Sequence, residues 1–226
     1  ACTLDQITGG RVILAPGSGW FGNECKAYGI TEWSDDGLKR IQRLDESLDI
    51  IRGLMTSDVT EGFDYQGEFY TLKGAYCNPK PVQKPTPPIW VAGDSLPTQE
   101  LMMKHGDVWF MYSKSPAVVK GLVDGMKQKL TERPFEVAIS AVGLADKNQR
   151  ETNEWGQKYA DERKHRFPIP PTVEDVLESN MVGDQAQVRD RIDHWIDAGI
   201  NHLVIQPMPP MECMRFFGEK IIHHYS

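Results

Sequence analysis

The stretch IWVAGDSLPTQELMMKHGDVWFM, residues 89–111, decides the fold class of this 226-residue chain. It begins with an apolar run at 89–92 and passes through a polar turn at 93–95. A helical pattern follows from about 97 to 105, and a second apolar run occupies 108–111. Short apolar runs bounded by turn residues are typical of buried strands. A strand, a helix and another strand in succession predict a parallel βαβ unit.

The same alternation extends in both directions from this unit. Three further apolar runs predict buried strands at 11–16, 137–142 and 202–206. Aromatic residues around a glycine-containing turn at 63–70 predict a small hairpin or an extended excursion, and the proline-rich segment 78–88 is expected to be extended. Apolar residues spaced by three and four predict helices at about 36–54, 116–131 and 185–198. The alternation with strands predicts further helices at about 97–105 and 211–224, and a polar helix at about 151–164.

Five strands, each followed by a helical segment, predict a parallel α/β sheet, either open and doubly wound or closed as a barrel. A complete eight-unit barrel typically needs about 250 residues. On the barrel interpretation, residues 1–226 form a single domain of five units and three units are absent. The chain also begins without Met, in what is expected to be the last turn of a helix closed by Gly9 and Gly10. Such a start is typical of a fragment.

The composition indicates a soluble globular protein, with 40% hydrophobic and 25% charged residues. Lys and Arg number 25 against 32 Asp and Glu, a net charge of −7 that would repel a phosphate backbone or an anionic membrane. Neither nucleic acid nor a membrane is therefore an expected partner. No apolar run or leader pattern indicates export, so the expected location is cytoplasmic. The four cysteines and six histidines show no metal-ligand spacing, which predicts free thiols and no metal site.

Two turns at predicted strand ends are candidate ligand sites. The turn Gly93-Asp94-Ser95 precedes a helix, whose free N–H groups and dipole favour an anion; alternatively, Ser95 is only the helix N-cap. The turn at 17–21, GSGWF, contains glycines that let a ligand approach the backbone and aromatic rings that could flank a planar group. The alternative is a tight turn with a packing aromatic.

Charged residues outside these turns offer further candidates. Glu24 and Arg40 could bond a ligand or pair with each other. His165 and Arg166 lie in a basic, proline-broken segment at 163–173, which is either a lid carrying cationic groups for an anionic substrate or a solvated run of charge.

Taken together, several segments resemble the bacterial luciferase-like flavin-dependent monooxygenases. They are LDQITGGRVILAPGSGWFGNECKAYGI at 4–30, RIQRLDESLDIIRGLM at 40–55, FDYQGEFYTL at 63–72, NPKPVQKPTPPIWVAGDS at 78–95 and MVGDQAQVRDRIDHWIDAGINHLVIQ at 181–206. The resemblance implies a TIM (β/α)8 barrel with an insertion, in which this chain supplies strands four to eight. Within the family, the SGW turn is similar to that of the alkanesulfonate, dimethyl sulfone and pyrimidine-ring monooxygenases.

The resemblance also implies which residues contact the cofactor. Ser18 and Glu24 would lie near the flavin, and Arg40 and Ile41 beside it. Gly93, Asp94 and Ser95 would lie at the FMN phosphate. Two residues depart from the family pattern: Ala15 stands where some relatives carry Asn, and Asp94 where small or hydroxyl residues are common. A carboxylate beside a phosphate is unfavourable unless Asp94 turns away. His165 and Arg166 are the catalytic candidates, on the substrate-side loop.

The activity that the resemblance implies uses reduced FMN, delivered by a separate NAD(P)H-dependent flavin reductase, and oxygen to oxidise a small organic substrate, expected to be an organosulfur compound. The full-length protein is expected to be a homodimer or a larger homo-oligomer. Two alternatives remain open. One is a deazaflavin-dependent oxidoreductase of the same fold, and the other is a non-catalytic flavin-binding remnant.

Overall fold

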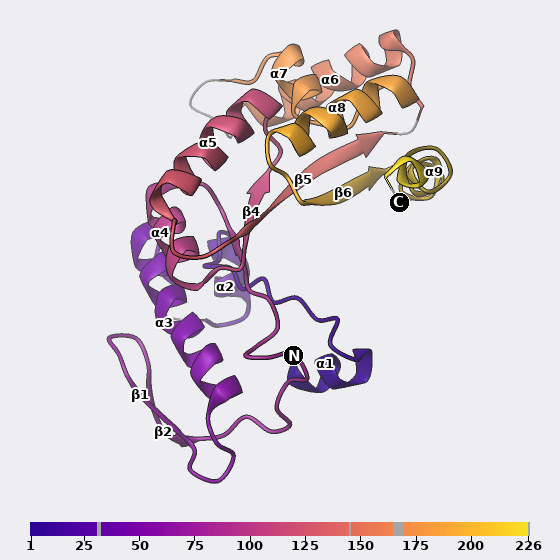
Figure 1. Ribbon diagram of the computed structural model, residues 1–226. Helices are drawn as coiled ribbons and strands as arrows, with labels where there is room; N and C mark the ends of the chain where they lie inside the picture. Colours follow the sequence, from indigo (N-terminus) through magenta and orange to yellow (C-terminus); the bar gives the residue numbers. More distant parts are fainter. Residues whose placement is uncertain (31–32, 145, 165–169, 226) are drawn as a thin grey trace. The chain divides into compact units, whose positions relative to one another are not determined.

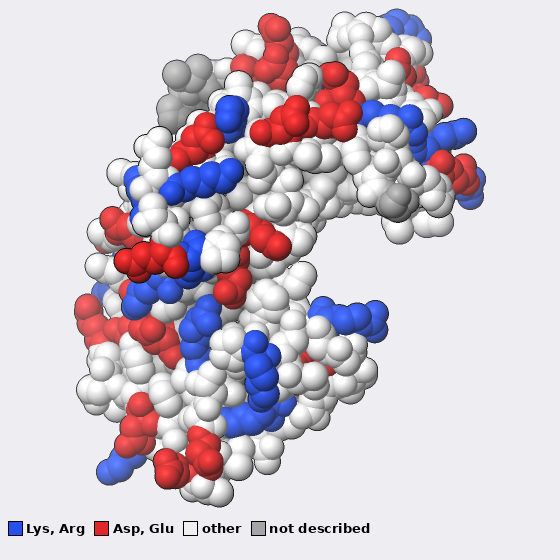
Figure 2. Space-filling view, in the orientation of Figure 1, with Lys and Arg blue, Asp and Glu red and all other residues white. Residues whose placement is uncertain are grey.

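The computed structural model describes residues 1–30, 33–144, 146–164 and 170–225 (Figure 1). The chain forms two compact units, Ala1–Trp109 and Phe110–Ser226, each with buried apolar residues of its own. Among the described residues, no helix combines the length and the apolar character needed to span a bilayer. Figure 2 shows acidic and basic side chains interspersed over the visible face, so the negative charge does not form one continuous acidic patch there.

The first unit is built around one long helix and a hairpin. Its elements are α1 Cys2–Thr8, α2 Gly22–Ala27, α3 Gly37–Thr56, β1 Phe63–Gln66, β2 Thr71–Ala75, β3 Trp90–Ala92, α4 Leu96–His105 and the start of β4 Val108–Tyr112. The helix α1 ends at Gly9, as predicted, because glycine tolerates the left-handed φ of 64° found there. The helix α3 is capped by Asp36, whose Oδ1 accepts the N–H of Leu38 at 2.9 Å. Strands β1 and β2 pair antiparallel, so the hairpin prediction is confirmed.

The second unit alternates strands with covering helices. After β4 come α5 Pro116–Lys129, β5 Glu136–Leu144, α6 Gln149–Arg163, α7 Val173–Glu178, α8 Gln185–Asp197, β6 His202–Met208, α9 Pro210–Phe216 and the short helices η2 Phe217–Ile221 and η3 Ile222–His224. In β5, all residues from Val137 to Leu144 are buried, as in a parallel strand covered on both faces. The helices α5 and α8 contribute Val123 and Trp195 to the core.

The principal sheet has the strand order β3-β4-β5-β6. Strands β5 and β6 pair in parallel from Ala138 opposite His202 to Leu144 opposite Met208. The spatial order of the strands follows the chain order, as expected when each crossover joins neighbouring strands. Four of the five predicted strands and the α/β class are therefore confirmed.

The fifth predicted strand, at 11–16, is wrong as a strand. Only Leu14 pairs, in an isolated parallel bridge with Ile89. The N–H of Leu14 donates to the Pro88 carbonyl at 2.9 Å, and its own carbonyl accepts the N–H of Trp90 at 2.7 Å. The next rung in each direction would need an N–H from Pro16 or from Pro88, and proline has none. Two prolines therefore limit this pairing to a single rung.

The last predicted helix, at 211–224, is continuous only in part. It is α-helical to Phe216, after which η2 is a π-helical turn and η3 a 3-10 turn. Adjacent side chains on a regular α-helix point about 100° apart. Here Phe216 and Phe217 are both buried, and their rings meet edge to face with centroids 5.6 Å apart. The wider turn thus accompanies the burial of two consecutive aromatic residues.

A buried carboxylate anchors α1 in the first unit. Asp5 is fully buried, and its two oxygens accept the backbone N–H of Gln83 at 3.0 Å and the Gln83 side-chain amide at 2.7 Å. The same amide donates to the Val12 carbonyl at 2.8 Å. Burial opposes ionisation of Asp5, but the hydrogen bonds from Gln83 outweigh it and hold the pKa of the carboxyl below its ordinary value.

We expect Asp5→Asn to lower the melting temperature of the first unit at neutral pH, because an amide NH2 would then face a donor of Gln83. The folded pKa of Asp5 lies below the unfolded value of about 3.9, so its stabilisation is present above that pH and is lost as the pH falls through the folded pKa. Thermal melts between about pH 3 and 7 should show the wild type and the variant converging toward acid.

The matched control is Glu61→Gln, which removes an exposed carboxylate from the same unit. It should leave the pH dependence of the wild type unchanged. A difference between Asp5→Asn and the wild type that stays constant at every pH would contradict the assignment.

Candidate functional site

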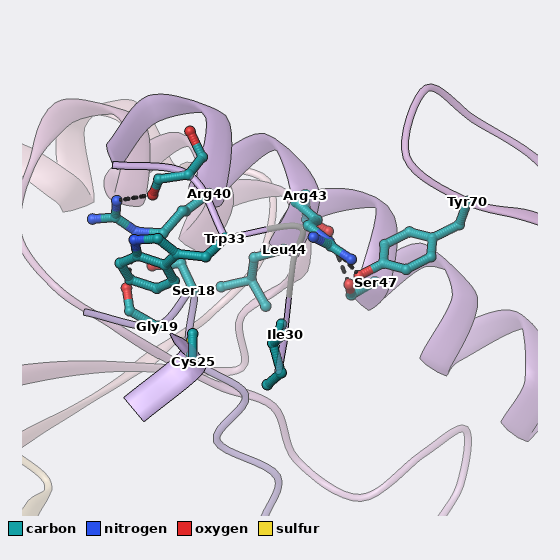
Figure 3. A pocket seen from close by; sticks show the side chains of 12 residues that line it. Ser18, Gly19, Cys25, Ile30, Trp33, Arg40, Arg43, Leu44, Ser47 and Tyr70 are labelled. Carbon is teal, nitrogen blue, oxygen red and sulfur yellow. Dashed lines mark hydrogen bonds between the residues drawn. The ribbon is translucent and has the colours of Figure 1, made fainter. Parts of the chain in front are cut away.

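A pocket of about 240 Å³ opens in the first unit between the turn at 17–19 and the first half of α3 (Figure 3). It is lined by Gly17, Ser18, Gly19, Cys25, Ile30, Trp33, Ser34, Arg40, Arg43, Leu44, Ser47 and Tyr70. The lining combines two arginines, two aromatic rings and three serines with apolar side chains. Such a mixture suits a planar, polar ligand with an apolar face.

Arg40 fixes one wall of this pocket. Its Nε donates to the Gly19 carbonyl at 3.0 Å, and its Nη1 donates to the Ser34 carbonyl at 2.6 Å. The guanidinium also lies over the Trp33 ring, 4.6 Å from the ring centroid (Figure 3). One side chain of α3 therefore holds two loop segments and an indole together. This role depends on the planar fork of donors, which lysine lacks.

Two glycines let the Trp33 ring lie close to the backbone. Gly19 has a φ of +79°, and a Cβ there would lie 3.0 Å from the Trp33 ring. A Cβ on Gly22 would lie 2.7 Å from the Trp33 Nε1. The indole N–H donates to Asp35 at 3.1 Å, which fixes the plane of the ring. The sequence GSGWFG thus provides a close approach for an indole of its own chain.

Glu46 brings Tyr70 to the opposite wall. Its carboxylate accepts three backbone N–H groups at the tip of the β1–β2 hairpin: Glu68 at 2.6 Å, Phe69 at 3.0 Å and Tyr70 at 3.1 Å. Gly67 adjoins this carboxylate, and a Cβ there would force the Glu46 side chain to move. The Glu46 carboxylate thereby docks the backbone of the tip on α3.

Arg43 meets the docked Tyr70 within the pocket. Its Nε donates to the Tyr70 hydroxyl at 2.9 Å, and the guanidinium lies 5.3 Å from the Tyr70 ring centroid. Figure 3 shows Arg43 and Tyr70 pointing toward each other, while the hydroxyl of Ser47 donates to the Arg43 carbonyl at 2.8 Å. The hairpin therefore contributes a phenol to a site otherwise made by α3 and the loops before it.

The structure brings together only some of the residues that the sequence analysis singled out. Ser18 and Arg40 both line the pocket. Glu24 is exposed in the first turn of α2 and does not line it. Ile41 lines a separate depression of about 210 Å³ between α3 and α4. His165 and Arg166 lie outside the described residues.

The turn Gly93-Asp94-Ser95 lies where it was expected, between β3 and α4, but does not line the pocket. Ser95 caps α4: its Oγ accepts the N–H of Thr98 at 3.4 Å and lies 2.8 Å from the Thr98 hydroxyl. The Gly93 carbonyl accepts the Trp109 indole N–H at 2.7 Å, and the Asp94 carbonyl accepts the Gln99 side-chain amide at 2.9 Å. Ser95 is therefore the N-cap of α4, and the choice between a cap alone and a cap that also binds an anion stays a prediction.

Trp33, Arg43, Ser47 and Tyr70 line the pocket but were not among the residues predicted from the sequence. One signal was available: Arg40, Arg43 and Ser47 are spaced by three and four residues, which places them on one face of a helix. Tyr70 had no such signal, because its place depends on the long-range contact between Glu46 and the hairpin tip.

An ion-pair cluster joins α3 to α4 outside the pocket. Lys104 Nζ lies 2.7 Å from an Asp45 oxygen and 3.1 Å from an Asp49 oxygen, and the buried His105 Nε2 lies 2.5 Å from Asp45. Burial opposes ionisation of Asp45, but the hydrogen bonds from Lys104 and His105 outweigh it and lower its pKa. Asp45, Asp49 and His105 each offer one possible metal-ligand atom, and these three atoms lie within 4.8 Å of one another. The Lys104 ammonium, however, already balances the negative charge of the two carboxylates.

The family of the chain follows from comparison with known proteins. Residues 1–202 match the model of the luciferase-like monooxygenases, so the chain belongs to this family of oxidoreductases, as the motifs predicted. The FMNH(2)-dependent dimethylsulfone monooxygenase of Pseudomonas putida is 24% identical over 97% of this chain and 67% of that protein. The F420-dependent glucose-6-phosphate dehydrogenase of Amycolatopsis mediterranei is 28% identical over 89% of this chain and 65% of its own length. The chain thus spans about two thirds of these curated relatives.

Solved structures show the same fold at lower identity. An F420-dependent secondary alcohol dehydrogenase matches with a TM-score of 0.78 and 20% identity, over 98% of this chain and 72% of that one. The long-chain alkane monooxygenase LadA matches with a TM-score of 0.76 and 17% identity, over 99% of this chain and 64% of its own. The predicted fold class, a luciferase-like TIM barrel, is confirmed by these neighbours.

We expect Glu46→Gln to release the hairpin tip from α3, because a neutral amide replaces a carboxylate that accepts three backbone N–H groups. The loss should cost about 1–3 kcal/mol of stability. Hydrogen exchange should quicken at the amides of residues 68–70. The neighbouring Glu68→Gln is the control, since the Glu68 side chain is exposed, and it should leave those rates unchanged. Equal protection in Glu46→Gln and the wild type would refute the docking role.

Proposed function

We propose that this chain is the greater part of an FMN-dependent monooxygenase, in which the pocket at 17–19 and α3 holds the flavin ring. The observation that carries the proposal is the family match over residues 1–202. The dimethylsulfone monooxygenases among the relatives support FMN as the cofactor and a small organosulfur compound as the substrate. An NAD(P)H-dependent flavin reductase would then be a separate partner. The proposal also includes a cytoplasmic location and a homo-oligomeric state of the full-length protein.

The residues of the pocket fit part of a flavin. Ligand pockets commonly measure about 300–1,000 Å³. A pocket of about 240 Å³ therefore suits a ring-sized portion and not a whole mononucleotide. The Trp33 and Tyr70 rings offer flat apolar faces, and Ser18 and Arg43 offer donors for ring oxygens and nitrogens. Gly17 also lines the pocket, and a Cβ there would meet nothing within 4 Å, so its backbone is open to close approach.

Reduced FMN, when bound, would supply the electrons that activate oxygen. The chain's own residues would bind and orient it and exclude water. Arg40 would act as a positioning residue, because its hydrogen bonds hold the Gly19 and Ser34 carbonyls in the wall. Arg43 would place positive charge beside the ring, and Ile30 and Leu44 would keep one face of it dry.

The remaining positions implied by the family resemblance are part of the same proposal. The phosphate would lie at Gly93, Asp94 and Ser95, before the N-terminus of α4, with the Asp94 carboxylate turned away. Ile41 would lie beside the flavin and Glu24 near it. His165 and Arg166 would face the substrate as catalytic residues.

A deazaflavin cofactor is the second candidate. It is favoured by the F420-dependent glucose-6-phosphate dehydrogenase of Amycolatopsis mediterranei, which is 28% identical to this chain. A non-catalytic flavin-binding remnant is the third. Anaerobic titration of the chain with reduced FMN and with reduced F420 separates the three. A preference for FMN, together with oxidation of dimethyl sulfone when a flavin reductase is present, is expected. Tighter binding of F420 would support the second candidate, and FMN binding without turnover of any sulfone or sulfonate would support the third.

We expect Arg43→Gln to weaken reduced FMN binding about tenfold, as loss of one charged hydrogen-bond donor does. Lys39→Gln is the matched control, because it removes the same charge from an exposed position on the same helix. Fluorescence titration under nitrogen measures both dissociation constants. Equal weakening by the two substitutions would indicate a general charge effect and would contradict a role for Arg43 in the pocket.

A further inference from the structure

Two cysteines that are distant in sequence lie in contact within the first unit. The Sγ of Cys2 on α1 is 3.5 Å from the Sγ of Cys77, which follows β2, although 75 positions separate them. Cys2 is buried, with 7% of its surface exposed, whereas Cys77 is half-buried. Both are free thiols in this structure. The pair lies outside the pocket described above.

Contacts that do not involve the thiols hold the two segments together. The Gln6 side-chain amide donates to the Lys80 carbonyl at 2.9 Å. Asp5 accepts the two hydrogen bonds from Gln83 at 3.0 and 2.7 Å. These contacts lie within a few residues of Cys2 on one side and Cys77 on the other. The sulfur atoms are therefore brought together by the fold and not by their own weak interaction.

The separation is short enough for a covalent bond. A disulfide has an S–S length of about 2.05 Å, so the sulfur atoms must approach by about 1.5 Å. Small rotations of two side chains can supply a movement of this size. The other cysteines are engaged elsewhere: Cys25 lines the pocket, and the buried thiol of Cys213 donates to the Gly143 carbonyl at 3.1 Å.

We propose that Cys2 and Cys77 are a redox modification site, a dithiol that a hydroperoxide converts to a reversible disulfide. Cys77 reacts first, because it is the less buried residue of the two. Burial, and then the contact with Cys77, raise the pKa of the Cys2 thiol, which suits Cys2 to the second, resolving step.

The two steps balance. The Cys77 thiolate attacks the hydroperoxide, an S–O bond forms, the O–O bond breaks, and the leaving oxygen is protonated to water or an alcohol. Cys77 is then a sulfenic acid. The Cys2 sulfur attacks the Cys77 sulfur, the S–S bond forms, and hydroxide leaves with the proton that Cys2 releases. Two thiols lose two electrons in total, and the peroxide gains them.

The disulfide would tie α1 to the segment that leads into β3. It would close a loop across the 75 positions between the cysteines, and long closed loops restrict the unfolded chain most. The oxidised first unit should therefore melt at a higher temperature than the reduced one, and dithiothreitol should reverse the shift.

The test treats the whole chain with hydrogen peroxide, blocks the remaining thiols and digests it with trypsin without reduction. Trypsin does not cleave Lys80–Pro81 or Lys84–Pro85, so Cys2 falls in the peptide 1–11 and Cys77 in the peptide 74–104. The expected result is a linked species of these two peptides and a loss of two of the four titratable thiols.

Three variants make the outcome decisive. Cys25→Ser should form the same link as the wild type. Cys77→Ser should form no link, and Cys2→Ser should accumulate a sulfenic acid on Cys77 that dimedone traps. Retention of all four thiols in the treated wild type would overturn the proposal. So would a link through Cys25 or Cys213, or a Cys77 disulfide between two chains, which non-reducing electrophoresis would show as a dimer.

Discussion

The first unit depends on the buried carboxylate of Asp5. Through Gln83 it fastens the N-terminal helix to the proline-rich segment, and the same glutamine reaches the Val12 carbonyl. Two residues further along, Leu14 forms its one rung with Ile89, where β3 is about to begin. One buried charge thus connects three stretches of chain that share no regular secondary structure. The cost of burying that charge is offset because donors face both oxygens.

The fold was predictable to the extent that local patterns determine it. The spacing of apolar residues in α3, α5 and α8, the Asp36 cap and the continuous apolar run of β5 all act within a few residues of chain. The segment at 11–16 shows the limit of this reasoning. Its own composition favours a strand, but the partner that it meets carries Pro88, which removes a donor from the ladder. Pro16 within the segment limits the ladder at one end, but the limit at the other end arises only when this segment meets one more than 70 residues away.

The pocket was predictable on one side only. The glycine turn at 17–19 and Arg40 were recognisable from the sequence, whereas Tyr70 reaches the site because Glu46 docks the hairpin tip. The two arginines of α3 also differ in their tasks, although three residues separate them. Arg40 donates its hydrogen bonds to the backbone carbonyls of Gly19 and Ser34, whereas Arg43 donates to the Tyr70 hydroxyl in the cavity. Residue type alone does not distinguish an arginine that holds the wall together from one whose guanidinium meets another side chain inside the cavity.

The single rung between Leu14 and Ile89 has a mechanical consequence. Several consecutive hydrogen-bonded pairs fix both the position and the direction of a strand. A single pair fixes the position of one residue but leaves the direction of the chain beyond it undetermined. The direction in which the chain leaves Pro16 is then set from the far end, where Arg40 holds the Gly19 carbonyl. The position of the glycine turn, and with it one wall of the pocket, therefore depends on α3 and not on the sheet that the chain has just left.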